Sequence, residues 1–114
     1  MEDCLFCKIA EGSIPSERVA ETERVLAFRD INPAAPTHVL LIPKAHVADS
    51  AAQLRGEHGE LLAELFELAA RVAVQEQLED GWRLVTNVGA GAGQTVFHLH
   101  IHLVGGRPLG WPPG

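Results

Sequence analysis

The sequence has few cysteines, little positive charge and no long apolar run. Of its 114 residues, two are cysteine and nine are lysine or arginine, against fifteen aspartate or glutamate, so its formal net charge is −6. A broad basic surface for nucleic acid is therefore not expected, because such surfaces hold phosphates through many Lys and Arg contacts. Cys4 and Cys7 lie too close in sequence to close a long, stabilising disulfide loop.

The sequence also lacks the segments that direct a chain into or across a membrane. Its first residues are acidic, and no basic segment followed by an apolar run marks a secretory signal. The longest apolar runs are interrupted within a few residues by Pro, Lys, His or Arg, so none is long enough to span a bilayer. We therefore expect a cytoplasmic protein whose partners include neither a membrane nor a nucleic acid.

Length and composition favour a single small domain. With 114 residues, 46% of them hydrophobic, the chain can bury one modest core and is short for two. No internal repeat, linker or low-complexity segment divides it. We therefore expect residues 1–114 to form one domain, in which the glycine- and proline-rich residues 105–114 are an irregular tail.

The spacing of apolar residues predicts an α+β fold. Short extended segments are expected at residues 19–21, 25–28, 38–42, 82–88 and about 95–104. A short helical turn is expected at residues 4–12, and the period of apolar residues predicts a long amphipathic helix at about 57–78. This order favours an antiparallel sheet of about five strands, with one long and one short helix packed on one side.

Three histidines alternate with apolar residues in the last expected strand. Because strand side chains alternate between faces, His98, His100 and His102 would share one face, opposite Leu99 and Ile101. Three imidazoles add little to packing and repel one another when protonated. A metal, a nucleophile or an anionic ligand would account for the pattern, and a solvated strand face is the simple alternative.

A glycine-rich loop precedes these histidines. Glycine allows unusual backbone dihedral angles and a close approach of N–H groups to a ligand, for which phosphate oxygens are natural acceptors. Residues 89–94 are thus either a phosphate-binding loop or a plain hairpin loop. Gln94 and Thr95 bring hydrogen-bonding side chains close to His98 and His100, which favours the phosphate-binding loop.

The two cysteines admit three explanations. The spacing of Cys4 and Cys7 occurs in zinc half-sites and in redox pairs, and two reduced thiols are also possible. Zinc favours four tetrahedral ligands from cysteine and histidine, and His46 and His98 are candidates for the other two positions. The spacing alone leaves all three explanations open.

Together these motifs resemble the histidine triad (HIT) superfamily, and within it the nucleotide-binding branch. The alternating histidines at 98–102 are similar to the triad signature. Five further segments resemble that branch, namely residues 30–33, 36–38, 42–46, Asn87 before the glycine loop, and 105–107 with the terminal 111–114. The likeness runs from about Cys4 to the last residue and implies the HIT-like fold.

The resemblance implies an enzyme, a purine nucleoside phosphoramidate hydrolase with AMP or GMP as its nucleotide part. His100 would attack the α-phosphorus and form a covalent nucleotidyl-imidazole, with no divalent ion required. His102 and the amides of residues 93–96 would stabilise phosphate charge, while His38 would help to protonate the departing amine. Hydrolysis of dinucleoside polyphosphates is one alternative, and a non-catalytic, zinc-stabilised nucleotide-binding or interaction protein is another.

The resemblance also implies how the nucleotide is held. Asp30 would accept hydrogen bonds from the ribose hydroxyls, and Phe28 and Ile31 would form apolar walls for the base. The other implied nucleotide contacts are Asn87, Gly93, Gln94, Thr95, Val96, His100 and His102. Thr95 stands where serine is common in the branch and retains the hydroxyl.

The same resemblance implies a structural zinc ion and a homodimer. Cys4, Cys7, His46 and His98 would bind the zinc, as in superfamily members with an N-terminal Cys-x-x-Cys. A zinc-bound His98 would be the scaffold member of the catalytic triad and could not bind substrate freely. The long helix and the tail at 105–114 would supply the dimer contacts, with the tail near the active site.

Overall fold

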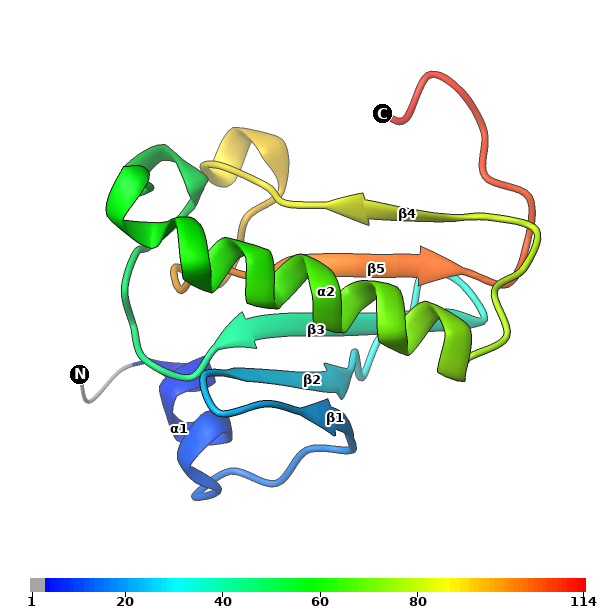
Figure 1. Cartoon of the computed structure of the whole chain (residues 1–114). Helices are drawn as coiled ribbons and strands as arrows, with labels where there is room; N and C mark the ends of the chain where they lie inside the picture. Colours follow the sequence, from blue (N-terminus) through cyan, green and yellow to red (C-terminus); the bar gives the residue numbers. More distant parts are fainter. Residues whose placement is uncertain (1–3) are drawn as a thin grey trace.

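The computed structural model describes residues 4–114, which form a five-stranded antiparallel sheet with a helix on each face (Figure 1). In chain order the helices and strands are α1 (Leu5–Glu11), β1 (Arg18–Glu21), β2 (Val25–Arg29), β3 (Thr37–Pro43), α2 (Gly59–Gln75), β4 (Trp82–Val85) and β5 (Ile101–Gly105). The strand order is β1-β2-β3-β5-β4, so β1 and β4 are the edges. The predicted α+β class and five strands are confirmed. Within the described residues, no helix combines the length and apolarity needed to cross a membrane.

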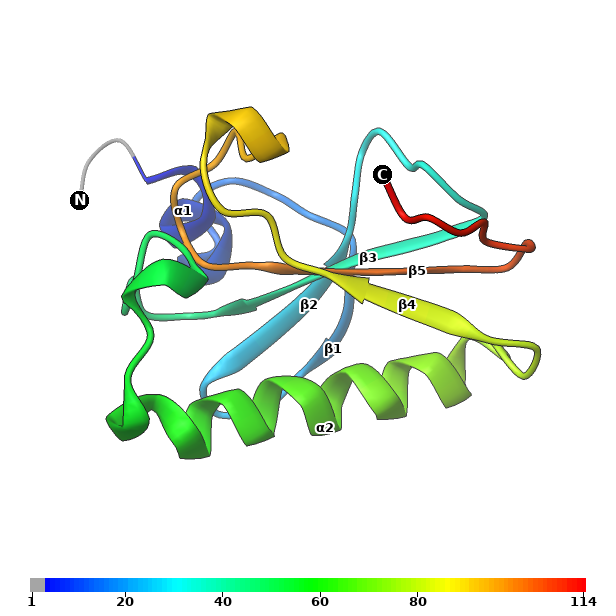
Figure 2. The ribbon, with the colours of Figure 1, turned by 90° about the horizontal axis from the view of Figure 1, so that it is seen from above.

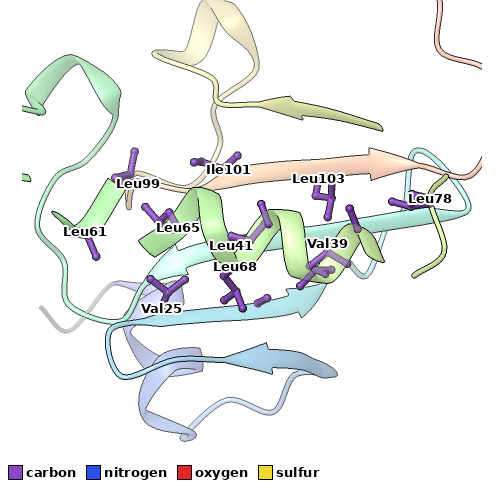
Figure 3. Packing of buried hydrophobic residues seen from close by; sticks show 14 of the residues in the cluster. Val25, Val39, Leu41, Leu61, Leu65, Leu68, Leu78, Leu99, Ile101 and Leu103 are labelled. Carbon is purple, nitrogen blue, oxygen red and sulfur yellow. The ribbon is translucent and has the colours of Figure 1, made fainter. Parts of the chain in front are cut away.

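Helix α2 covers one face of the sheet through an apolar stripe. Leu65, Leu68 and Val72 recur at helical spacing and are almost completely buried. They pack against alternate strand residues, including Val39 and Leu41 of β3 (Figure 3). Because each buried side chain of this size contributes roughly 1.5–3 kcal/mol, this layer is the main apolar contribution to stability.

Helix α1 lies on the opposite face, so the expectation that both helices pack on one side is wrong (Figure 2). Phe6 and Ile9 of α1 pack against Leu40 and Ile42 of β3, whose side chains point away from α2. The reason is that β3 is buried along its whole length, so both of its faces need a cover. His102 pairs with Leu40 and therefore lies on the α1 face.

The histidine strand is shorter than predicted, because it begins only at Ile101 and leaves His98 and His100 before it. Strand β3 ends at Pro43, which has no N–H group with which to extend the ladder. The carbonyl of Pro43 instead accepts the Nε2–H of His98 at 2.8 Å. The Leu99 N–H donates outside the sheet, to the Ala48 carbonyl at 2.9 Å.

Other strands and helices also begin or end at residues that differ from the predicted ones. Strand β4 stops at Val85 rather than residue 88, and the hydroxyl of the next residue, Thr86, donates to the His100 carbonyl at 2.7 Å. Helix α2 starts at Gly59, after a 3-10 turn at Gly56–His58. Gly12 ends α1 as expected, with φ at 88° and its N–H donating to the Ile9 carbonyl.

Candidate active site

Four histidines converge on the α1 face of the sheet, where Phe6 of α1 packs against two of them. His38 comes from β3, His102 from β5, and His98 and His100 from the extended segment before β5. The rings of His100 and His102 have centroids 5.0 Å apart, and those of His102 and His38 are 5.2 Å apart. The ring of His98 instead lies 4.9 Å from that of His46. The residues therefore separate into a row of three imidazoles and a second group around His98.

The backbone fixes which nitrogen of His100 carries the proton. Its Nδ1–H donates to the His98 carbonyl at 2.7 Å, so Nε2 carries the lone pair in the neutral ring. The Thr86 hydroxyl holds the carbonyl of His100, and the Phe6 ring packs edge-on against its imidazole at 5.1 Å. A buried imidazole with a fixed free nitrogen is suited to nucleophilic attack.

His38 and His102 form a second fixed pair. The Ala34 N–H donates to Nδ1 of His38 at 3.0 Å, so the proton of the neutral His38 ring lies on Nε2. This Nε2–H donates to Nδ1 of His102 at 2.9 Å, with Oδ2 of Asp30 at 3.5 Å. His102 must then carry its own proton on Nε2. Direct protonation of a leaving group by His38 is not supported, because both of its ring nitrogens are engaged inside the protein.

Burial keeps His102 neutral near pH 7. Loss of solvent, followed by the nearby His100 and His38, lowers the pKa of His102 to about 4, and the Asp30 carboxylate opposes this change only weakly. Burial likewise lowers the pKa of His98. His102 is therefore neutral at physiological pH, which agrees with its Nδ1 accepting the Nε2–H of His38.

The second group contains the two cysteines, whose sulfur atoms lie in disulfide contact in this structure. Nδ1 of His46 lies 3.4 and 3.9 Å from the sulfurs of Cys4 and Cys7, and Nδ1 of His98 lies 3.2 and 3.6 Å from them. All four donor atoms fall within 4.8 Å of one another. Two sulfurs and two nitrogens around a tetrahedral zinc ion are separated by about 3.6 Å across each S–N edge, given the usual bond lengths.

The outer nitrogens of His46 and His98, meaning the ring nitrogens that point away from the sulfurs, also make contacts that suit a metal site. Nε2–H of His46 donates to Oδ1 of Asp49 at 2.6 Å, and Nε2–H of His98 donates to the Pro43 carbonyl. Both rings therefore direct a lone pair on Nδ1 at the sulfurs, and oxygen acceptors of this kind orient metal-bound histidines. The donor set fits zinc once the two cysteines are reduced to thiolates.

The expected nucleoside contacts lie beside the histidine row. Oδ1 of Asp30 accepts the Asn32 N–H at 2.8 Å, which leaves its other oxygen near His38. Phe28 is buried beneath Phe6, with ring centroids 5.6 Å apart, whereas Ile31 is 92% exposed. Phe6 was not predicted as a site residue, although its position between the two cysteines is a signal that could have indicated it.

The glycine loop offers two free backbone donors. The amides of residues 92–94 donate to carbonyls within the loop, which turns through Gly89 and Gly93 at φ values of 86° and 95°. In the part of the chain that the structure describes, the N–H groups of Thr95 and Val96 have no protein acceptor. A Cβ at Gly93 would lie 4.0 Å from Nδ2 of Asn87, so the Asn87 amide also borders the loop.

Gln94 has a different place from the one expected. It is 4% exposed, and its amide group makes three hydrogen bonds to the backbone. Oε1 accepts the Gly89 N–H at 2.8 Å, while Nε2 donates to the carbonyls of Asp49 at 2.8 Å and Val96 at 3.1 Å. The expected contact of its side chain with a nucleotide is therefore not supported, and Gln94 holds the loop instead.

A family model described as the HIT domain matches residues 11–109 of this chain. The chain belongs to the HIT family. This HIT protein is 44% identical over 110 residues to the purine nucleoside phosphoramidase of Escherichia coli K12, an alignment that covers 96% of this chain and 92% of that relative. It is 51% identical over 111 residues to the 14 kDa zinc-binding protein of Zea mays, covering 96% and 87% of the two chains.

Solved structures share the fold as well as the sequence. The crystal structure of the HIT family hydrolase from Legionella pneumophila Philadelphia 1 superimposes with a TM-score of 0.94 at 52% identity, covering 98% of this HIT protein and all of that chain. The HIT family hydrolase from Clostridium thermocellum gives a TM-score of 0.92 at 47% identity, covering 96% of both chains. The HIT fold and membership in a family of hydrolases are thereby established, and the Cys/His group is compatible with zinc.

Proposed function

We propose that this HIT protein hydrolyses purine nucleoside phosphoramidates through a covalent nucleotidyl intermediate on His100. The observation that carries this proposal is the hydrogen bond from Nδ1–H of His100 to the His98 carbonyl, which reserves Nε2 for the phosphorus. The name of the Escherichia coli relative, at 44% identity, supports the phosphoramidate as the substrate class.

The reaction proceeds in two displacements. Nε2 of His100 donates its lone pair to the α-phosphorus, the phosphorus–nitrogen bond of the substrate breaks, and the leaving nitrogen takes up a proton from solvent water as the amine departs. A water molecule then attacks the same phosphorus and releases a proton to solvent, the bond to His100 breaks, and the nucleoside monophosphate leaves. The positive charge that forms on the imidazole during the first step is stabilised by the His98 carbonyl.

The other polar groups act on the phosphate and the ribose. Nε2–H of His102 and the free amides of Thr95 and Val96 are the donors for the charge that grows on the phosphoryl oxygens. His38 acts through His102, since its Nε2–H fixes the His102 ring. Asp30 accepts hydrogen bonds from the ribose, beside the apolar residues Phe28 and Ile31.

We also propose that zinc binds Cys4, Cys7, His46 and His98 in the reduced protein. When bound, zinc supplies structural cross-linking and takes no part at phosphorus. The residues themselves explain the benefit, because α1 carries both cysteines and also Phe6, which packs on His100. The zinc-binding relative from Zea mays supports this assignment.

A homodimer is the proposed assembly. The outward face of α2 carries Phe66 and Val74, which are 52% and 80% exposed, and among the described residues β4 is an unpaired edge of the sheet. Exposed apolar side chains and open sheet edges are both typical of surfaces that a second copy covers. Sedimentation of the purified protein tests this assembly directly.

Turnover of a fluorogenic adenosine phosphoramidate tests the proposed activity. His100→Ala is expected to reduce turnover at least about a thousandfold while AMP binding persists. His58→Ala is the matched control, since His58 caps the 3-10 turn before α2, and it should retain parental turnover. Comparable turnover in His100→Ala would remove the nucleophile assignment.

Two further outcomes would favour the alternatives. Faster cleavage of a diadenosine polyphosphate than of the phosphoramidate would indicate dinucleoside polyphosphate hydrolysis. AMP binding by the parent protein without turnover of either substrate would indicate a binding or interaction protein.

A further inference from the structure

The segment that follows β3 joins the Cys/His group to the glycine loop. Nε2–H of His46 donates to the Asp49 carboxylate at 2.6 Å, and the carbonyl of the same Asp49 accepts Nε2–H of Gln94 at 2.8 Å. The Asp49 N–H donates to Oε1 of Gln53 at 2.7 Å, which fixes the turn between these two contacts. One residue, Asp49, is thus bonded to both neighbouring groups.

Gln94 completes the connection on the loop side. Its Oε1 accepts the N–H of Gly89 at the start of the loop, and its Nε2 also donates to the carbonyl of Val96 at the end. The loop therefore cannot open without breaking hydrogen bonds of a side chain that is 4% exposed. Buried groups that lose their partners carry a substantial free-energy cost.

The arrangement is compact in space. Both views show the segment after β3, the turn at Ala90–Ala92 and α1 at the same end of the molecule (Figure 1, Figure 2). The loop then leads through the free amides of Thr95 and Val96 to His98, which is itself part of the Cys/His group. The two ends of the loop are thus tied to the same group of four donors.

We infer that Gln94 is a positioning residue that couples metal binding at the Cys/His group to phosphate binding by the glycine loop. This inference rests on the proposed function for its choice of AMP as probe, and on the proposed zinc site. Metal binding holds His46 and hence Asp49, which holds Gln94 and the amides that face the phosphate. Because coupling is reciprocal, AMP must tighten zinc binding by the factor with which zinc tightens AMP binding.

Calorimetry of AMP binding to the reduced protein, with and without zinc, measures this coupling. We expect zinc to tighten AMP binding at least about fivefold in the parent protein and less than about twofold in Gln94→Met, which preserves side-chain length without hydrogen bonds. Gln75→Met is the matched control, because Gln75 donates to the Val19 carbonyl far from the site, and it should keep the parental factor. Zinc affinity, measured by chelator competition with and without AMP, should give the same factors.

A second variant and a second readout separate coupling from damage to the fold. Gln94→Glu keeps an acceptor for the Gly89 N–H but loses the donors to Asp49 and Val96, so it should also lose the coupling. Amide hydrogen exchange at Gly89, whose N–H donates to Oε1 of Gln94, needs no ligand, and zinc should slow it in the parent and not in Gln94→Met.

Three results would overturn the inference: a parent in which zinc does not tighten AMP binding, parental coupling in both Gln94 variants, or exchange at Gly89 that zinc does not change in the parent. None of them depends on turnover. A parent that shows the coupling without cleaving phosphoramidates would contradict the proposed function alone, and one that cleaves them without the coupling would contradict this inference alone.

Discussion

Two groups of histidines lie side by side on one face of this protein, and they differ in what their outer nitrogens contact. In the Cys/His group, the outer nitrogens of His46 and His98 donate to oxygen atoms. In the row that contains His38 and His102, the outer nitrogen of His38 accepts the N–H of Ala34. In His46 and His98, the nitrogen that faces the other members of the group therefore carries a lone pair. In His38, the nitrogen that faces His102 carries a proton.

This difference decides which group suits a metal. Asp30, His38 and His102 also place three ligand atoms within 4.8 Å of one another. A metal bound to Nε2 of His38 would require the ring proton to move to Nδ1, where it would face the Ala34 N–H. Proximity of ligand residues is therefore not sufficient, because the backbone around each ring sets its tautomer and thereby its chemistry.

The largest effect is expected from a variant that removes one cysteine of the Cys/His group. Cys4→Ser should abolish stoichiometric zinc binding and remove about 4 kcal/mol from the free energy of unfolding at a free zinc concentration about 1,000 times the parental Kd. His102→Asn, which changes the other group, should retain one zinc per chain. Metal analysis and urea unfolding measure both effects. If His102→Asn lost zinc and Cys4→Ser retained it, the metal would lie in the row of His38 and His102 and not in the Cys/His group.

The next effect tests whether His38 acts by donating to His102. His38→Leu should lower kcat/KM about a hundredfold, because it removes the donor that fixes the His102 ring. His38→Gln places an amide N–H near the former Nε2 position and should recover a large part of that loss. Equal activities of the two variants would indicate that His38 contributes only by packing.

A smaller effect is expected at Thr86, whose hydroxyl holds the carbonyl of His100, the proposed nucleophile. Thr86→Val keeps the shape but removes the hydroxyl, so it should cost about 1 kcal/mol of stability and lower kcat several-fold. Thr86→Ser keeps the donor and should restore kcat. A KM change without a kcat change would place Thr86 in substrate binding rather than in the support of His100.

The smallest expected effect is the pH dependence of stability from His102. Its pKa is about 4 in the folded protein and about 6.5 in the unfolded chain, so the unfolded chain binds more protons between these values. Its contribution to stability is thus fully present above pH 6.5 and is lost as pH falls towards 4. Exposure of part of the ring to solvent reduces the magnitude.

Urea unfolding of parent and His102→Asn at pH 7 and pH 4.5 isolates this contribution. The other groups that face the ring, His38, His100 and Asp30, remain in both proteins, so their titration largely cancels in the difference. We expect the parent to lose more stability than the variant over this interval. An equal loss would show that the pKa of His102 is the same in the folded protein as in the unfolded chain.

The strands and helices were predicted well from the sequence, but the face of the sheet on which each helix packs was predicted poorly. The period of the α2 stripe is a local property, and it marks the helix to within three residues at each end. The face on which a helix packs depends instead on which side of β3 remains uncovered. β3 is apolar at nearly every position, so its own pattern does not distinguish the faces.

The residues that gather at the candidate site were easier to predict from the sequence than the contacts that their side chains make. The alternation of His98, His100 and His102 survives, although only His102 lies on a strand. The structural role of Gln94 and the engagement of both His38 nitrogens depend on hydrogen bonds with distant backbone groups, which one-dimensional spacing does not encode. The same is true of Phe6, whose contact with His100 follows from the packing of α1.

The distance along the chain between Cys4 and His98 constrains how the protein matures during synthesis. Their side chains meet across 94 positions of sequence, so the Cys/His group cannot close until almost the entire polypeptide has left the ribosome. The two thiols emerge first and remain without their histidine partners for most of translation. Zinc uptake by this group, as proposed, would thus report completion of the fold, and truncated chains that end before residue 98 would lack one of its four donors.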